Sequence, residues 1–433
     1  MKFHGSRRDF LKTTTAAGLG ILAAEQGAWA QAKSANEKIN FAAIGVGGKG
    51  ESDTADAARS GNLVAICDVD ENILNRAAQK YPNAKKYTDF RKMLEELGKS
   101  IDAVTVSTPD HTHAPAAAMA MKMGKHCFCQ KPLTHDIYEA RTLGELARQH
   151  KVATQMGNQG TANPGVRRAA ATVRAGVVGP VKEVHVWTNR PIWPQGVPRP
   201  QAENPPTTVH WDEWLGPAPE RPYGKGYHTF GWRGWWDFGT GALGDMACHT
   251  MNMPYMALDL RHPISVQAET AGHNKDSYPA WSIIRYEFPA TDARPALTLY
   301  WYDGKKVPGK ELTDGIEAKS SGSLIIGEKG KLYSPDDYGA EFKLLGGAQE
   351  IEVDYVRSPG HFEEWVRAIR GGEAAMSNFP DYASPMTETV LLGNLAVWAD
   401  GKKVEWDAKN LKATNAPEVA HIIRKPYRKG WEL

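Results

Sequence analysis

Asp245 and His249 are residue types that can move a proton, and they stand four positions apart. Residues at this spacing share one face of a helix. A histidine near a hydroxyl is the usual general base that takes its proton while hydride leaves the carbon, and a carboxylate one turn away can orient the ring. The preceding glycines also permit a structural reading, in which Asp245 caps the helix and His249 packs. We interpret the pair as candidate catalytic and substrate-binding residues.

Lys131 is the third candidate, since it follows the apolar segment 127–129 and precedes Pro132. An open α/β sheet places its ligand crevice at the carboxyl ends of its parallel strands. A cation there can stabilise a developing alkoxide and hydrogen-bond a cofactor ribose. We therefore expect Lys131 to act in catalysis and to contact cofactor and substrate, with Gln130 beside it at the cofactor. The alternative is a lysine that merely begins a surface loop.

The element that must position these groups begins with a glycine-rich turn. The apolar segment 39–44 runs directly into Gly45, Gly47 and Gly50, and a segment with helical composition follows. In a dinucleotide-binding βαβ unit the first glycine makes the tight turn, the second lets the backbone approach a pyrophosphate, and the third permits close helix packing. The helix N-terminus then faces the phosphates, and we expect Gly48 to contact the cofactor too.

A second apolar strand, 63–67, ends on Asp68. Its distance from the glycines is near the ~20 residues at which an acidic side chain hydrogen-bonds the ribose diol. The acidic residues that follow offer no arginine for a 2′-phosphate, which favours NAD over NADP. We predict a bound NAD that Lys49 and Asp68 both contact.

The segment 107–113 closes another strand and opens a helix. We expect Thr108, Pro109 and His113 to contact the cofactor, although Asp110 would equally serve as a helix cap. The roles of the two histidines in this segment stay open. They are too few to indicate a metal site, and we predict none.

Two weaker signals concern the substrate. Asn158 and Gln159 follow a strand, and we expect the first at the cofactor and the second at the substrate. Tryptophan and other aromatic residues gather before Asp245, and indole faces pack well on the C–H groups of sugars. The aromatic residues that we expect at a carbohydrate are Trp193, Tyr227 and Trp235.

The front of the chain has the pattern of an export signal. Arg7 and Arg8 precede a short apolar stretch, and Ala28-Trp29-Ala30 forms a small-residue cleavage site. The adjacent arginines indicate the twin-arginine route, by which proteins cross folded. We therefore expect a protein of the periplasm or a secreted one, with residues 1–30 excluded from the fold.

Composition excludes several classes of partner. The formal net charge of +2 arises within the first 30 residues, so the remainder is near neutral and gives no support for nucleic acid as a partner. No apolar run is long enough to span a membrane. Four cysteines are too sparse for a disulfide framework.

Length indicates two domains. Strands alternate with helices over 38–160, which predicts a doubly wound parallel sheet that binds NAD. Over 161–400 we expect an α+β domain with an open, mostly antiparallel sheet, used for substrate binding and oligomerisation. Residues 401–433 are expected to wrap the surface.

These motifs together resemble the Gfo/Idh/MocA oxidoreductases (glucose–fructose oxidoreductase, inositol dehydrogenase and relatives). The likeness spans nearly the whole mature chain and includes Gly176 to Gly179. It implies that Lys131, Asp245 and His249 act on a substrate carbinol and that the chain forms homo-oligomers, dimers or tetramers. Gln130 stands where the family usually has Glu, and Ala247 where Gly is common. The Gln130-Lys131-Pro132 variant and the twin-arginine pattern also look similar to a secreted subgroup of that family.

Three hypotheses follow. The first is an oxidoreductase that acts on a hydroxyl of a sugar, sugar derivative or polyol, with a tightly bound NAD that is recycled on the enzyme. The second is an NAD-dependent glycoside hydrolase that oxidises the sugar transiently, eliminates the aglycone, hydrates the product and re-reduces it. A non-catalytic sugar or cofactor binder is the third.

Overall fold

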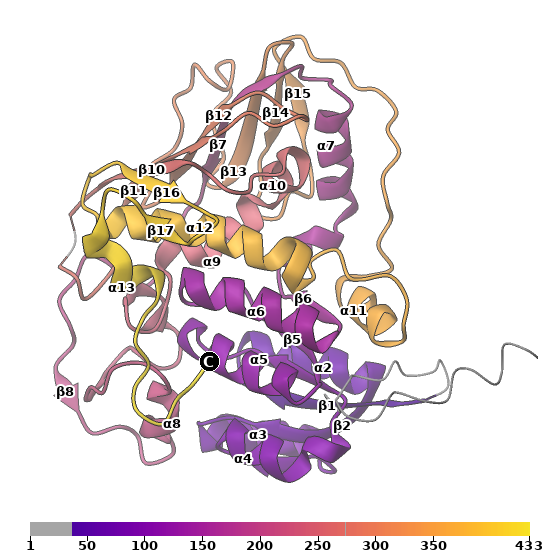
Figure 1. The fold of residues 1–433 in the computed structure, drawn as a ribbon, viewed down its shortest axis with the longest axis vertical. Coiled ribbons are helices and arrows are strands. Elements are labelled where there is room, and N and C mark those ends of the chain that lie inside the picture. Colours follow the sequence, from indigo (N-terminus) through magenta and orange to yellow (C-terminus); the bar gives the residue numbers. More distant parts are fainter. Residues whose placement is uncertain (1–36, 273) are drawn as a thin grey trace, which may run out of the picture.

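The computed structural model describes residues 37–272 and 274–433 (Figure 1). The predicted export signal therefore lies outside the described residues.

The first domain is a six-stranded parallel sheet in the order β3-β2-β1-β4-β5-β6. Its strands are β1 (Ile39–Ile44), β2 (Gly61–Cys67), β3 (Lys85–Tyr87), β4 (Ala103–Val106), β5 (His126–Cys129) and β6 (Thr154–Met156). Its helices are α2 (Lys49–Ser60), α3 (Glu71–Lys80), α4 (Phe90–Leu97), α5 (Asp110–Lys122) and α6 (Ile137–His150). The predicted doubly wound parallel sheet is confirmed.

The order of this sheet reverses between β1 and β4, which is where such folds bind ligands. Ile44 pairs with Cys67 on one side and with Val106 on the other, so three strands end at one level. Cys129 pairs with Val106 and brings the end of β5 to the same edge. The loops after these strands carry Gly45, Asp68, Thr108 and Lys131.

The second domain is built on a nine-stranded sheet in the order β15-β14-β13-β7-β12-β11-β10-β16-β17. Only β7 and β12 pair in parallel; the other neighbours are antiparallel, as the sequence predicts. The strands are β7 (Val181–Trp187), β10 (Ser265–Thr270), β11 (Ser282–Phe288), β12 (Leu297–Tyr302), β13 (Gly322–Gly327), β14 (Lys331–Ser334), β15 (Lys343–Leu345), β16 (Val404–Asp407) and β17 (Lys412–Ala413). The last two extend the sheet from the segment expected to wrap the surface.

The remaining α-helices follow the first sheet in sequence. They are α7 (Pro164–Arg174), α8 (Trp211–Leu215), α9 (Gly241–Thr250), α10 (Asn252–Leu258), α11 (His361–Ile369), α12 (Ser384–Trp398) and α13 (Ala420–Ile423). A short ribbon of β8 (Ala202–Glu203) and β9 (Tyr223–Gly224) lies apart. Nearly all of α12 is buried, because it packs against α6, α9 and strands β10 and β11 of the second sheet (Figure 1). Among the described residues, no helix is long and apolar enough to cross a membrane.

The chain returns to the first sheet at α11. The Trp365 ring packs 5.7 Å from both the Phe41 and Phe128 rings, and Phe362 joins the same buried cluster. The apolar face of α11 thus packs against β1 and β5. A segment that lies between β15 and β16 of the second sheet in sequence thus completes the core of the first domain.

Candidate active site

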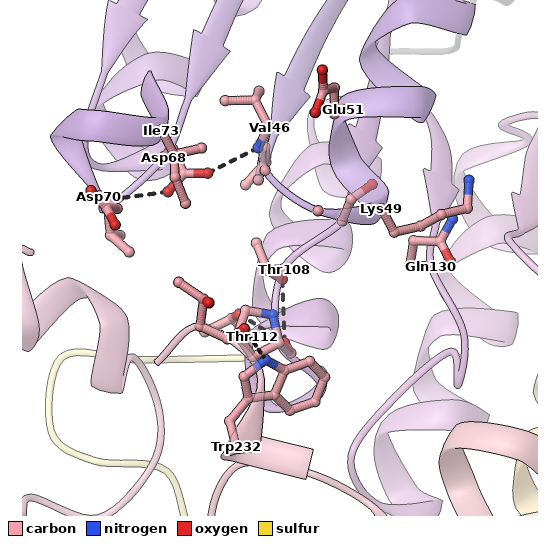
Figure 2. A pocket seen from close by; sticks show the side chains of 18 of the residues that line it. Val46, Lys49, Glu51, Asp68, Asp70, Ile73, Thr108, Thr112, Gln130 and Trp232 are labelled. Carbon is pink, nitrogen blue, oxygen red and sulfur yellow. Dashed lines mark hydrogen bonds between the residues drawn. The ribbon is translucent and has the colours of Figure 1, made fainter. Parts of the chain in front are cut away.

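A cavity of about 910 Å³ opens at the carboxyl edge of the parallel sheet. One end is lined by the glycine turn, Asp68 and α3, and the other by Lys131, Asp245 and His249 of α9. Figure 2 shows the end that includes Asp68, Lys49 and Gln130. The predicted cofactor and catalytic residues therefore share one continuous space.

The glycine turn fits a pyrophosphate. A Cβ at Gly45 would lie 2.5 Å from the Ser107 carbonyl oxygen, and one at Gly50 would lie 2.1 Å from the Gly45 carbonyl oxygen. Only glycine allows this approach, and Gly45 also has φ +78. No side chain caps the N-terminus of α2 at Gly48, and both Gly48 and Lys49 line the cavity, so the positive end of the helix dipole faces the place of an anion. Gly50 itself lies behind the turn and supports it.

Asp68 presents its carboxylate at the end of β2. Its Oδ2 accepts the Val46 N–H at 3.0 Å and its Oδ1 accepts the Asp70 N–H at 3.0 Å, which fixes the side chain beside the cavity (Figure 2). Burial raises the pKa of Asp68, against these two backbone hydrogen bonds. The position suits the ribose contact predicted from the sequence.

A segment of the second domain closes this end of the cavity. The His228 Nε2 lies 2.9 Å from Asp70 Oδ2. The Glu71 N–H donates to the Thr208 carbonyl at 2.9 Å. The His210 N–H donates in turn to the Val69 carbonyl at 2.9 Å. We call residues 208–228 the strap. It ties the second domain to the turn that follows Asp68.

Lys131 and Asp245 meet at the other end. The Lys131 Nζ donates to Asp245 Oδ1 and to the Asp245 carbonyl oxygen, both at 2.9 Å. Arg233 Nε donates to the same Oδ1 at 3.2 Å. Burial works to raise the pKa of Asp245, but the charges of Lys131 and Arg233 outweigh it and hold the pKa at about 2. Asp245 is therefore an ionised carboxylate that holds two cations at the cavity wall.

His249 lies one turn along α9 from Asp245 and is 4% exposed. Burial, and then the charge of Lys131, lowers its pKa to about 3, so the ring is neutral near pH 7. Its buried Nδ1 has no hydrogen-bond partner among the described residues. The Tyr338 ring packs edge-on against it at 5.0 Å. A neutral imidazole at this place is competent as a general base.

The structure accounts for glutamine at position 130. Gln130 Nε2 donates to Asp53 Oδ2 at 2.8 Å, and Asp53 is 1% exposed. The same carboxylate accepts Ser107 Oγ at 2.8 Å and pairs with Lys49 Nζ at 2.5 Å. A glutamate at 130 would face this carboxylate, whereas the amide can donate to it.

We expect Gln130→Glu to lower the free energy of unfolding by ~1–3 kcal/mol at pH 7, because it replaces a buried donor with a second carboxylate. Urea titration of NAD-free protein measures this. The loss should shrink as the pH falls and one carboxyl takes up a proton. Gln159→Glu, at a residue that lines the open cavity, is the matched control. Equal stability of Gln130→Glu and the parent protein at pH 7 would contradict the account.

Asp110 also lines the cavity, although its position at the start of α5 first indicated a helix cap. Thr240 Oγ1 donates to its Oδ2 at 2.6 Å. Burial raises the pKa of Asp110 to about 7, although the Thr240 hydrogen bond and the charges of Arg233 and Lys131 act in the opposite direction. Near neutral pH this carboxyl can hold or release a proton.

This pKa makes stability depend on pH with a defined sign. The folded pKa of about 7 exceeds the ordinary 3.8, so the folded state binds the proton more tightly than the unfolded chain does. The contribution is complete below pH 3.8 and is lost as the pH rises through 7. We expect the parent protein to lose about 1 kcal/mol more between pH 6 and pH 8 than Asp110→Asn does. Parallel urea titrations measure the difference, and identical pH dependences would contradict it.

Several predicted residues do not line the cavity. Asn158 is fully buried, and its Oδ1 accepts Ser377 Oγ at 2.5 Å. His113 is buried with its ring nitrogens 2.9 Å from the Pro132 carbonyl and 2.8 Å from the Thr108 carbonyl, so it joins two cofactor-side loops instead of facing the cavity. Both residues were expected at the cofactor.

The three aromatic residues expected at the substrate are placed in the core. Tyr227 packs 5.2 Å from Trp235, both within one buried cluster, and Trp193 is also buried. These large rings bury more area against one another than a cavity wall would allow. Phe230 and Trp232 of the same run do line the cavity.

Three further residues at the catalytic end escaped sequence analysis: Arg190, Arg233 and Tyr338. Arg233 stands within the aromatic run, and its guanidinium lies 4.2 Å from the Trp232 ring and 4.7 Å from the Phe230 ring. A cation among aromatic residues was the available signal. Tyr338 reaches His249 from the loop between β14 and β15, and nothing in the local sequence indicates that contact.

Within the described residues, no group of three or more His, Cys, Asp or Glu side chains is arranged to hold a metal ion. The cysteines, Cys67, Cys127, Cys129 and Cys248, are free and buried. The candidate site thus consists of a glycine turn, a ribose-side carboxylate and a Lys131–Asp245–His249 group.

Two family descriptions match the chain. Residues 39–158 match the Gfo/Idh/MocA oxidoreductase family's NAD-binding Rossmann fold, and residues 181–433 match the C-terminal alpha/beta domain of the same family.

Individual relatives are more distant. A glycosyl hydrolase family 109 protein of Saccharopolyspora erythraea is 30% identical over 34% of this chain and 38% of its own length. The D-xylose 1-dehydrogenase [NADP(+)] of Haloarcula marismortui is 26% identical over 38% of this chain and 47% of its own. The chain thus aligns with less than half the length of these curated relatives.

Among solved structures, the WlbA dehydrogenase from Bordetella pertussis, in complex with NADH and UDP-GlcNAcA, superimposes with a TM-score of 0.60. It is 17% identical, and the alignment covers 86% of this chain and 99% of that one. At this identity the likeness concerns the fold.

Proposed function

Because the chain belongs to the Gfo/Idh/MocA oxidoreductase family, we propose that it is an NAD-dependent oxidoreductase acting on a hydroxyl of a sugar, sugar derivative or polyol. The observation that carries this proposal is the Lys131–Asp245 contact of 2.9 Å on a cavity continuous with the glycine turn. It places a cation and a neutral histidine at the end of a dinucleotide site.

NAD, when bound, supplies the hydride acceptor. His249 takes the hydroxyl proton on its unprotonated ring nitrogen, since its pKa of about 3 keeps the ring neutral. The Lys131 ammonium donates a hydrogen bond to the developing alkoxide. Asp245 holds Lys131 and Arg233 in place. His249 is thus neutral and Asp245 ionised at neutral pH, as their roles require.

Purified protein loaded with NAD and mixed with a panel of sugars and polyols tests the proposal by nicotinamide absorbance. Single-turnover reduction by at least one carbinol is the expected result. Absence of hydride transfer with every member of the panel, from protein shown to hold NAD, would count against it.

The relative in glycosyl hydrolase family 109 favours a second candidate, an NAD-dependent glycosidase. This reaction needs a second proton-transfer group beside His249, and Asp110 with its pKa of about 7 supplies one. Release of nitrophenol from aryl glycosides without net NADH formation separates this candidate from the first.

Export and assembly form a further part of the proposal. We propose that the chain carries a twin-arginine signal over 1–30 and works in the periplasm, or is secreted, as a homo-oligomer with NAD retained and recycled. Mass spectrometry of the undenatured mature protein tests the retained cofactor and the subunit number together. A monomer without nucleotide would contradict both statements.

A further inference from the structure

The catalytic end of the cavity carries more positive than negative charge. Lys131, Arg190 and Arg233 line it, and Asp245 is the ionised carboxylate among them. The other acidic residues that line the cavity, Asp110 apart, lie toward the nucleotide end; there Glu51 pairs with Lys80 and Asp89 with Arg91. A neutral sugar would leave the excess charge at the catalytic end without a partner.

Hydrogen bonds and aromatic rings hold the Arg233 guanidinium in place at the cavity wall. Its Nε donates to Asp245 and its Nη1 donates to the Phe230 carbonyl at 3.1 Å. Within the described residues, its Nη2 has no hydrogen-bond partner. The rings of Trp232, Phe230 and Trp193 surround the guanidinium at 4.2, 4.7 and 5.8 Å. A guanidinium that is already held in this way loses little conformational freedom when it binds an anion.

Arg190 also lines the cavity, and it lies three residues beyond the end of β7. Its carbonyl accepts the Gly304 N–H at 2.8 Å, and three residues later Trp193 reaches Arg233. Its guanidinium bonds to the neutral Asn189 side chain, and in the described part of the chain no carboxylate pairs with it. Arg190 is therefore a cavity-lining cation without a counterion.

We propose that the substrate carries a carboxylate, as a hexuronic acid or its glycoside does, and that Arg190 and Arg233 bind this group while Lys131 and His249 act on a ring hydroxyl. Guanidinium groups present planar pairs of donors that match a carboxylate. The inference rests on the proposed function, because it names the substrate class of the same site.

Matched pairs of methyl glycosides test the inference. The gluco, galacto and manno hexuronides are compared with the corresponding hexosides, which share every ring hydroxyl and differ in the carboxylate, and with the 6-sulfated hexosides. Both kcat/KM and calorimetric binding to the NAD-loaded protein are measured. We expect at least one hexuronide to exceed its hexoside by about tenfold or more, with the advantage falling as salt rises.

Arg190→Gln should reduce this ratio about tenfold, and Arg190→Lys should reduce it less, because the charge stays while the planar fork is lost. Lys182→Gln removes a cation of β7 that does not line the cavity, and it should leave the ratio as it is. An unchanged ratio in Arg190→Gln would overturn the inference, as would equal use of hexuronide and hexoside by the parent protein.

Two further results of the glycoside comparison would have different meanings. Preference for the 6-sulfated hexoside over the hexuronide would overturn the assignment to a carboxylate. Binding of hexuronides without any oxidation would count against the proposed function, while the binding ratio and its response to Arg190→Gln would still decide this inference.

Discussion

Replacing Lys131 with methionine is expected to lower kcat by about 10²–10³-fold, as removal of a donor to a developing oxyanion does. Methionine keeps the length of the side chain and removes the charge. Asp245 would retain Arg233 as a partner at 3.2 Å, so the carboxylate stays neutralised while the hydroxyl loses its cation. Steady-state kinetics on the best carbinol of the panel measure the effect.

The controls for this variant separate chemistry from folding. NAD binding and the thermal transition should show that the protein is folded and loaded. Lys182→Met, at an exposed lysine paired with Glu328, should keep the parental kcat. A Lys131→Met protein with kcat within threefold of the parent would show that Lys131 is structural.

Replacing His249 with asparagine is expected to lower kcat by about 10²–10⁴-fold, the range that a positioned general base contributes. Asparagine retains a polar side chain at a buried position but cannot take up the proton. Single-turnover absorbance measurements at saturating sugar separate this loss from weaker binding. His421→Asn, at an exposed residue of α13, is the matched control.

The same histidine sets an expectation for the pH profile. A base with a pKa of about 3 is protonated, and inactive, only as the pH falls through that value. Between pH 5 and pH 8 we therefore expect no acid limb that arises from His249. A limb near pH 6.5 that disappears in His249→Asn would contradict this assignment.

Much of the site could be predicted because its parts are local in sequence. The glycine turn and Asp68 belong to one βαβ unit, and the spacing of Asp245 and His249 is a property of a single helix. Lys131 follows its strand immediately. The geometry of each motif follows from its local sequence, so these site residues could be predicted from a single sequence.

The rest depends on long-range packing. Arg233 becomes part of the site because α9 follows it and turns Asp245 toward it, and Tyr338 arrives on a loop nearly 90 residues beyond His249. Conversely, Trp235 and Tyr227 pack against each other and leave the cavity wall to Trp232. Composition predicts that aromatic residues gather, but only the fold decides which ring meets solvent.

The strands, too, divide into those that the local sequence predicts and those that depend on long-range packing. Strands with an apolar run, such as β1 and β2, were predicted within two residues of their bounds. The three-residue β3 and the edge strands β15 and β17 carry too few residues to show a period of two. Their pairing is imposed by neighbours already in the sheet.

The strap has a consequence for biogenesis. Thr208, His210 and His228 are synthesised long after the turn at Asp68 that they cover. The nascent first half can thus expose an open nucleotide groove, and enclosure must wait until the later half docks. Dinucleotide captured before that moment would be covered as these last contacts form.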